Sequence, residues 1–342
     1  MIMLDGDQLV FLFDEIHEAA ECRVHFQRTL RIPDDGREYP LPAGLGRFPL
    51  RHVDDFAGRI DEATTERGGV IVPMWQAEAL WIAFMPGERG DRPYPFALKI
   101  ATGKIDAVSG ERWAPELNRI AQNYVVVPGQ PWLDGYCVEK GLIRQFVAMP
   151  LGQGYTAEEQ ITGVAEFGGI QIQAFPMKAA RYEKLRRSRQ HLDMLADFTC
   201  ELATSPMTPR ISVQRSMGLA PGGRMRQHIY EDEFGADAWE LDATARCFVT
   251  ILNSADWQSV TGQAPPTQPP TSREYRRAGL PWFDYYSDRP ALAGSTTLAR
   301  LKSVFTLGNQ KGETPLPENE SVAPPSPVPL GPGPRRVREA NL

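Results

Sequence analysis

Several carboxylate side chains lie within one stretch of the chain, residues 134–159, and carboxyl groups can act as the acid and the base of a reaction. The candidates are Asp134, Glu158 and Glu159. Enzymes that hydrolyse glycosidic bonds use two carboxyl groups roughly 5–10 Å apart across a cleft. Arg144 alternates with apolar residues on a strand-like segment and would face the same cleft. One hypothesis is therefore a hydrolase or other ligand-processing enzyme with its catalytic residues in this stretch.

A glycine turn inside the same stretch is a second candidate site. Its binding candidates are Gly152, Gly154, Tyr155 and Thr156. The threonine and the glutamate three residues later form a capping box, which predicts a helix start, and backbone N–H groups at a helix start can hold an anion. The turn matches neither the P-loop nor the dinucleotide pattern, and the glutamates at 158 and 159 place negative charge where a phosphate would lie. We interpret the turn as structural and keep anion binding as the alternative.

A short aromatic motif occurs twice, at residues 131–136 and 281–286. Both copies read Pro-Trp-apolar-Asp-x-Tyr, although their flanking sequences differ. We interpret Trp132 and Trp282 as anchors against a core, with the aspartate capping a following turn. The alternative is a pair of ligand-binding surfaces, in which Trp132, Trp282, Asp284 and Tyr285 would contact the ligand.

The sequence predicts neither a metal site nor a cofactor. The five histidines and four cysteines show none of the close spacings that bind zinc or iron. In a chain this long, isolated cysteines are more often reduced core residues than members of a disulfide framework. The motif around a serine nucleophile, G-x-S-x-G, is missing as well.

Composition narrows the class of protein. The 342 residues are 42% hydrophobic and carry a net charge of -6, which favours a folded protein and gives no reason to expect nucleic acid as a partner. Apolar runs are too short to span a bilayer, and the run at residues 9–13 is too short for a signal peptide. We expect a cytoplasmic protein without membrane insertion.

Alternation of apolar and polar residues predicts a mainly β fold of the α+β class. Residues 8–13 and 22–30 form the first strand pair, and residues 70–108 read as a meander of four strands. Short turns between the strands favour antiparallel pairing over parallel crossovers. We expect an antiparallel sandwich or distorted barrel with several short helices and one longer helix near residues 179–204.

Four segments follow from these patterns. Residues 1–177 form an N-terminal β-rich unit, residues 178–210 a helical connector, and residues 211–312 a C-terminal unit of strands and short helices packed on the first. The last segment, residues 313–342, holds eight prolines in thirty residues and no periodic apolar pattern. Such a composition predicts a disordered tail.

Two functions remain open. The first is a soluble β-rich binding or assembly protein without a catalytic centre, whose partner is another protein or a second copy of itself. The aromatic motifs support it, because tryptophan and tyrosine dominate the energetics of protein interfaces. The second is the carboxylate-based enzyme at residues 134–159. Whether the chain is an enzyme stays undecided at this point.

Overall fold

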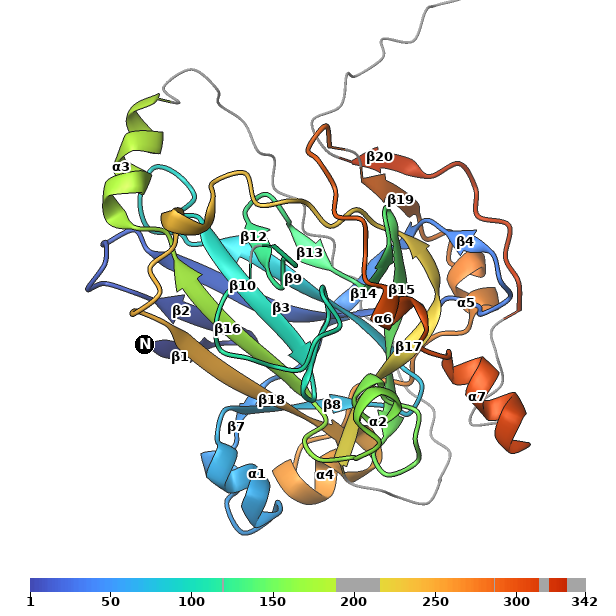
Figure 1. Cartoon of the computed structure of the whole chain (residues 1–342). Coiled ribbons are helices and arrows are strands. Elements are labelled where there is room, and N and C mark those ends of the chain that lie inside the picture. The colour runs from blue at the N-terminus through green and yellow to red at the C-terminus, as the bar shows by residue number, and fades with distance from the viewer. Residues whose placement is uncertain (119, 189–215, 286, 314–319, 331–342) are drawn as a thin grey trace, which may run out of the picture.

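The fold is mainly antiparallel β, as the sequence predicts. A computed structural model describes residues 1–118, 120–188, 216–285, 287–313 and 320–330 (Figure 1). Strands make up 37% and helices 18%, and the large sheet is open, consistent with a β sandwich and not with a closed barrel. None of the helices within these ranges is long and apolar enough to cross a bilayer.

The elements are short and numerous. The strands are β1 (Ile2–Asp5), β2 (Gln8–Leu12), β3 (Glu21–Thr29), β4 (Glu38–Tyr39), β5 (Leu41–Pro42), β6 (Gly44–Arg47), β7 (Arg51–His52), β8 (Val70–Met74), β9 (Ala79–Pro86), β10 (Phe96–Thr102), β11 (Ile105–Asp106), β12 (Val125–Val127), β13 (Trp132–Leu133), β14 (Gly135–Glu139), β15 (Leu142–Pro150), β16 (Ile170–Pro176), β17 (Ser216–Arg226), β18 (Ala245–Asn253), β19 (Trp282–Tyr285) and β20 (Val328–Leu330). The helices are η1 (Asp54–Phe56), α1 (Glu62–Arg67), α2 (Ala157–Thr162), α3 (Ala179–Ser188), η2 (Ala236–Ala238), α4 (Ser254–Thr261), α5 (Ser272–Arg277), α6 (Thr296–Ala299) and α7 (Val304–Lys311).

The large sheet folds over itself into two layers. One layer runs through β1, β2, β3, β9, β15 and β17, and the other through β12, β10, β16 and β18. The pairing of β17 with β18 joins them, and in Figure 1 the strands β10, β16 and β18 lie in front of β3. Phe13 and Phe96 meet between the layers at 5.8 Å, inside the main hydrophobic core. Burying apolar area between the layers is the main stabilising contribution.

Local signals in the sequence are confirmed. Thr156 and Glu159 form a complete capping box at the start of α2, and Gly163 ends that helix in the left-handed conformation. A second capping box starts α5 at Thr271. The first strand pair, β2 with β3, also has the predicted antiparallel pairing.

The predicted meander over residues 70–108 is wrong apart from its last hairpin, β10 with β11. Strand β9 pairs along its whole length with β3, and β10 pairs with β16. Strand β8 pairs in parallel with β18, a partner far away in the chain. Strands β8 and β10 are buried on both faces, so partners distant in sequence cover them better than sequence neighbours do.

The predicted long helix begins where expected, as α3, and Tyr182 on it packs against Tyr94 at a ring distance of 4.2 Å. The remainder of that prediction, residues 189–204, lies outside the described residues, as does most of the connector at 178–210. Strands on either side of the connector share one sheet, because β17 pairs with β15 and β18 with β16. The division into units stays a prediction.

Residues 320–330 depart from the expectation of a disordered tail. Val322 is 3% exposed within the main core, and β20 pairs in parallel with β19. The hydroxyl of Ser321 donates a hydrogen bond to Asp35. One buried valine between prolines is too short a signal for a periodicity argument to detect. Residues 314–319 and 331–342 lie outside the described residues.

We expect Val322→Ala to lower the free energy of unfolding by about 1–2 kcal/mol, because the variant loses buried apolar area. The matched control is Val328→Ala on β20, where the side chain is 46% exposed, and its effect should be within about 0.5 kcal/mol of zero. Urea denaturation of the full chain measures both. Equal effects of the two variants would mean that Val322 is not packed.

Candidate functional site

Asp134 lies buried between β13 and β14. It is 2% exposed, and its carboxylate accepts a hydrogen bond of 2.7 Å from Gln227 Nε2 and another from the Trp132 side chain. Gln227 Oε1 also accepts from the backbone N–H of Asp134, at 3.0 Å. Burial raises the pKa of Asp134 to about 7. That pKa suits acid–base work at neutral pH, yet the carboxyl group has no solvent-facing side from which to reach a substrate.

Arg144 on β15 belongs to a different cluster. Its Nη1 donates to the Gly222 carbonyl at 3.0 Å and lies 3.4 Å from Asp34 Oδ1. Asp34 also accepts a hydrogen bond from the Ser303 hydroxyl. The guanidinium thus ties the loop at Asp34 to β15 and β17.

The carboxylates of Glu158 and Glu159 accept hydrogen bonds from backbone N–H groups. Glu158 Oε2 accepts from the N–H groups of Phe167 and Gly168, at 3.2 and 2.8 Å. Glu159 accepts from the backbone of Thr156 and Gly154. Among the described residues, no hydrogen bond or ion pair joins any two of Asp134, Arg144, Glu158 and Glu159, so the structure does not bring the four catalytic candidates into one site.

The glycine turn is closed by its own helix and by α7. Gly152 and Gly154 are exposed and have positive φ angles, and the N–H of Gly154 donates a hydrogen bond to Glu159. The Tyr155 ring is buried, its hydroxyl donates to Glu313 at 2.8 Å, and Lys311 lies over its face at 4.1 Å. Because the donors at this helix start already have internal acceptors, the structural interpretation fits the turn better than anion binding.

The two aromatic motifs meet in space, a contact that their sequence separation hides. The rings of Trp132 and Tyr285 are 5.1 Å apart in an edge-on arrangement. Consecutive residues of one segment bind both aspartates. Arg226 donates to Asp284 from Nη2 at 2.9 Å and from Nε at 3.1 Å, and Gln227 donates to Asp134. The carboxylate of Asp134 accepts no hydrogen bond from a following turn among the described residues, so the cap that the sequence predicts there is not seen. For Asp284 the cap stays a prediction, because residue 286 lies outside the described residues.

The two motif tryptophans have different environments. Trp282 is 2% exposed, between Tyr39 at 6.1 Å and Tyr275 at 5.4 Å, and is therefore a core anchor as predicted. Trp132 is partly exposed. It contacts Trp81 of β9 at 6.1 Å as well as Tyr285. We call the partly exposed side chains of Trp81, Trp132 and Tyr285 the aromatic surface.

Polar groups border the aromatic surface along neighbouring strands. Pairing sets Trp81 opposite Gln27 and Ala83 opposite both His25 and Trp132, so these side chains share one face of the sheet. Gln27 Nε2 donates to His25 Nε2 at 3.2 Å, which requires the tautomer with hydrogen on Nδ1. Burial, with Arg47 nearby, lowers the pKa of His25 to about 4, so the ring is neutral near pH 7.

Two donors at this place have no acceptor among the described residues: His25 Nδ1 and Trp81 Nε1. Buried donors are usually paired, so these two are exceptions, and both atoms are themselves closed off from the surface. The sequence analysis missed Trp81 and His25. Strand alternation put His25 on the polar face of its strand, but only strand pairing shows that Trp81 and Trp132 lie beside it.

For the glycine turn, we expect Gly154→Ala to cost about 1 kcal/mol, because φ is +70° and an alanine side chain resists that conformation. Thr156→Ala should cost about 1 kcal/mol through loss of the cap. Exposed Thr296 on α6 provides the control, and Thr296→Ala should be near neutral. Chemical denaturation reads out all three; a folded Gly154→Ala protein that lost partner binding would contradict the structural interpretation.

For Asp134, the raised pKa means that the native state holds a proton that the unfolded chain releases near pH 4. Its stabilising contribution is therefore complete below about pH 4 and is lost as pH rises through about 7. Over this range, wild type should therefore lose unfolding free energy relative to Asp134→Asn as pH rises, by up to about 1.4 kcal/mol per pH unit. A pH-independent difference would show that Asp134 does not bind the proton.

The described residues contain no group of three or more His, Cys, Asp or Glu side chains arranged to hold a metal ion. No protein-family model, curated protein or solved structure matches the chain. A functional conclusion therefore depends on the chain's own geometry, in which the aromatic surface is the best-formed candidate.

Proposed function

We propose that this chain is a binding protein that acts through protein–protein contacts, and that its aromatic surface holds the partner. The observation that carries the proposal is the convergence of Trp81, Trp132 and Tyr285 from three separate segments onto one partly exposed place. Tryptophan and tyrosine supply most of the binding energy at protein interfaces, chiefly where they cluster.

The polar border supports a polypeptide partner. Gln27 is partly exposed and lies opposite Trp81, and a protein interface typically has an apolar centre with a polar rim. The rigid sheet beneath lowers the ordering cost of binding, because Trp132 is already held by Asp134 and Tyr285. Self-association through the same surface is a second form of the same proposal.

The alternative, a hydrolase or ligand-processing enzyme at residues 134–159, has less support. Asp134, Glu158 and Glu159 are each buried, and each carboxylate accepts a hydrogen bond from a backbone N–H group or a neighbouring side chain. These contacts do not place two carboxylates opposite each other across a cleft, which is the arrangement that hydrolysis needs.

The proposal includes a cytoplasmic location. Cys22, Cys137 and Cys247 carry free thiols in the core. Burial raises the pKa of each thiol, which keeps it protonated and unreactive. Thiols of this kind suit a reducing compartment.

The two motif tryptophans form a matched pair for a test. Trp282→Ala should lower the unfolding free energy by about 3–5 kcal/mol, because it empties a core position. Trp132→Ala should cost less and should abolish capture of the partner that the wild-type chain enriches from its native lysate. Exposed Leu241→Ala is the control and should keep that partner.

Affinity enrichment with mass spectrometry measures capture, and urea denaturation measures stability. If Trp132→Ala retains every protein that the wild type enriches, the aromatic surface is not the binding site. A small-molecule library that raises the melting temperature of wild type and not of Asp134→Asn would instead favour the enzyme.

A further inference from the structure

A second surface, away from the aromatic one, has the character of a docking groove. A groove of about 460 Å³ runs between α2, α6 and α7, and we call it the α2–α7 groove. Its lining consists of Gln160, Ile161, Thr297, Arg300, Leu301, Lys302 and Leu307. Figure 1 shows α7 at the outer edge of the molecule, beside α2.

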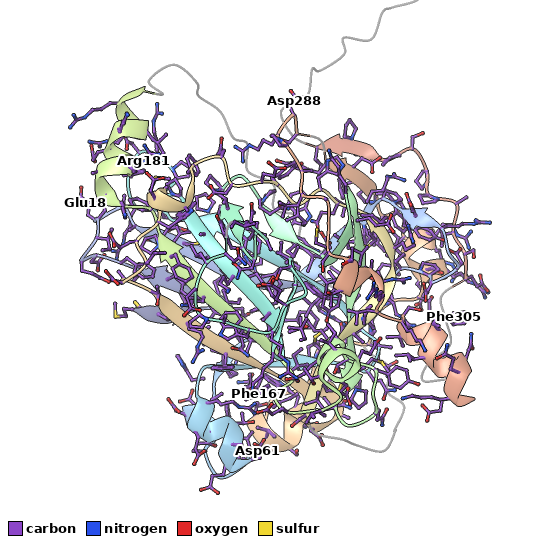
Figure 2. All side chains as sticks on the ribbon, viewed as in Figure 1. Glu18, Asp61, Phe167, Arg181, Asp288 and Phe305 are labelled. Carbon is purple, nitrogen blue, oxygen red and sulfur yellow. The ribbon has the colours of Figure 1, made fainter. Side chains whose placement is uncertain are left out.

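The groove has a defined shape because one side chain fixes its walls. Gln160 Oε1 accepts from the backbone N–H of Lys302 at 2.8 Å, and Gln160 Nε2 donates to the Lys302 carbonyl at 3.0 Å. The segment between α6 and α7 is thereby fastened to α2. Ile161 and Leu307 remain partly exposed on the walls, and Phe305 is 40% exposed on α7 (Figure 2).

Positive charge along the groove is not balanced by acidic residues. Residues 289–312 contain four basic residues and no acidic residue, in a chain whose net charge is -6. Arg300 and Lys302 are exposed, and neither pairs with a carboxylate among the described residues; Lys302 Nζ donates only to Gln310, at 2.9 Å. The carboxylates nearby are occupied, Asp34 by Arg144 and Ser303, and Glu313 by Tyr155.

We propose that the α2–α7 groove binds an acidic segment of another protein that carries a bulky apolar side chain. Arg300 and Lys302 pair with its carboxylates, and the apolar side chain lies between Ile161 and Leu307. Opposite charges steer such a segment to the groove, and apolar contact holds it there. The proposal goes beyond the aromatic surface and does not depend on it, because the two places share no residue.

Charge complementarity selects this occupant over two others. Nucleic acid is a poor fit, because the overall negative charge of the chain repels a polyanion, whereas the described lining of the groove offers two unpaired cations, Arg300 and Lys302. A second copy of this chain would need one of its own acidic segments. One such segment with an exposed apolar side chain, residues 231–242 with Leu241, lies against basic α3, where Arg181 donates to the Phe234 carbonyl.

The test uses the full chain and a panel of fluorescein-labelled peptides of about 12 residues, sized for one segment in one groove. Each peptide has a central Leu, Met or Phe flanked by Glu and Asp. A second panel replaces the acids by Gln and Asn, and a third replaces the central residue by Ser. Fluorescence anisotropy compares wild type with the double variant Arg300→Glu, Lys302→Glu, and with the control Arg276→Glu, Arg277→Glu on α5, which changes net charge equally.

We expect the acidic apolar peptides to bind wild type and the control alike, and to bind the groove variant at least about tenfold more weakly. The amide and Ser panels should bind poorly. Equal binding of the Ser panel would overturn the proposal in favour of simple charge attraction. Loss of binding in the control as well, or no binding of any acidic apolar peptide to wild type, would also overturn it.

Light scattering on the same samples gives the remaining outcome. If wild type forms oligomers that the groove variant does not form and the control does, the occupant is a second copy and the proposal is wrong. Trp132→Ala should bind the panel as wild type does, which separates failure of this proposal from failure of the aromatic surface.

Discussion

The positions of many other elements depend on strand β15. It is buried along most of its length, and it must form backbone hydrogen bonds with three neighbouring strands. It pairs with β14, with β17 and, over two residues, with β9. Gln145 at its centre is fully buried, and its amide binds both the Leu30 carbonyl and the Ile32 N–H. An unpaired group here would cost a few kcal/mol, so these partners fix where the N-terminal segment leaves its strand.

The aromatic surface is a consequence of that arrangement. Strand β15 pairs with β9, and β9 pairs with β13, so Trp132 lies opposite Ala83 and beside Trp81. Arg226 at the end of β17 and Gln227 directly after it reach the two motif aspartates. The surface therefore sits on paired strands and not on a loop. A rigid platform of this kind loses little conformational freedom on binding.

The buried side chain of Lys99 has a structural role. Lys99 is 1% exposed, and its ammonium donates to the carbonyls of Ala114 and Glu116, at 2.5 and 2.7 Å, while lying 5.1 Å from the Trp113 ring. Burial lowers the pKa of Lys99 and raises that of Asp106 to about 7, and each charge opposes the shift of the other. Lys99 thus fastens residues 113–116 to β10, a role that no local pattern indicates.

The sequence by itself determined the features whose physics is local. Contacts within a few residues explain both capping boxes and the glycine that ends α2. The period of a strand explains β2, β3 and the overall β character. Tertiary structure alone decided which strands pair, that β9 joins β3, that Trp132 meets Trp81 and Tyr285, and that Val322 packs in the core. Those outcomes depend on burying two sheet faces and pairing every buried polar group at once, and such a balance has no signature in any one stretch of residues.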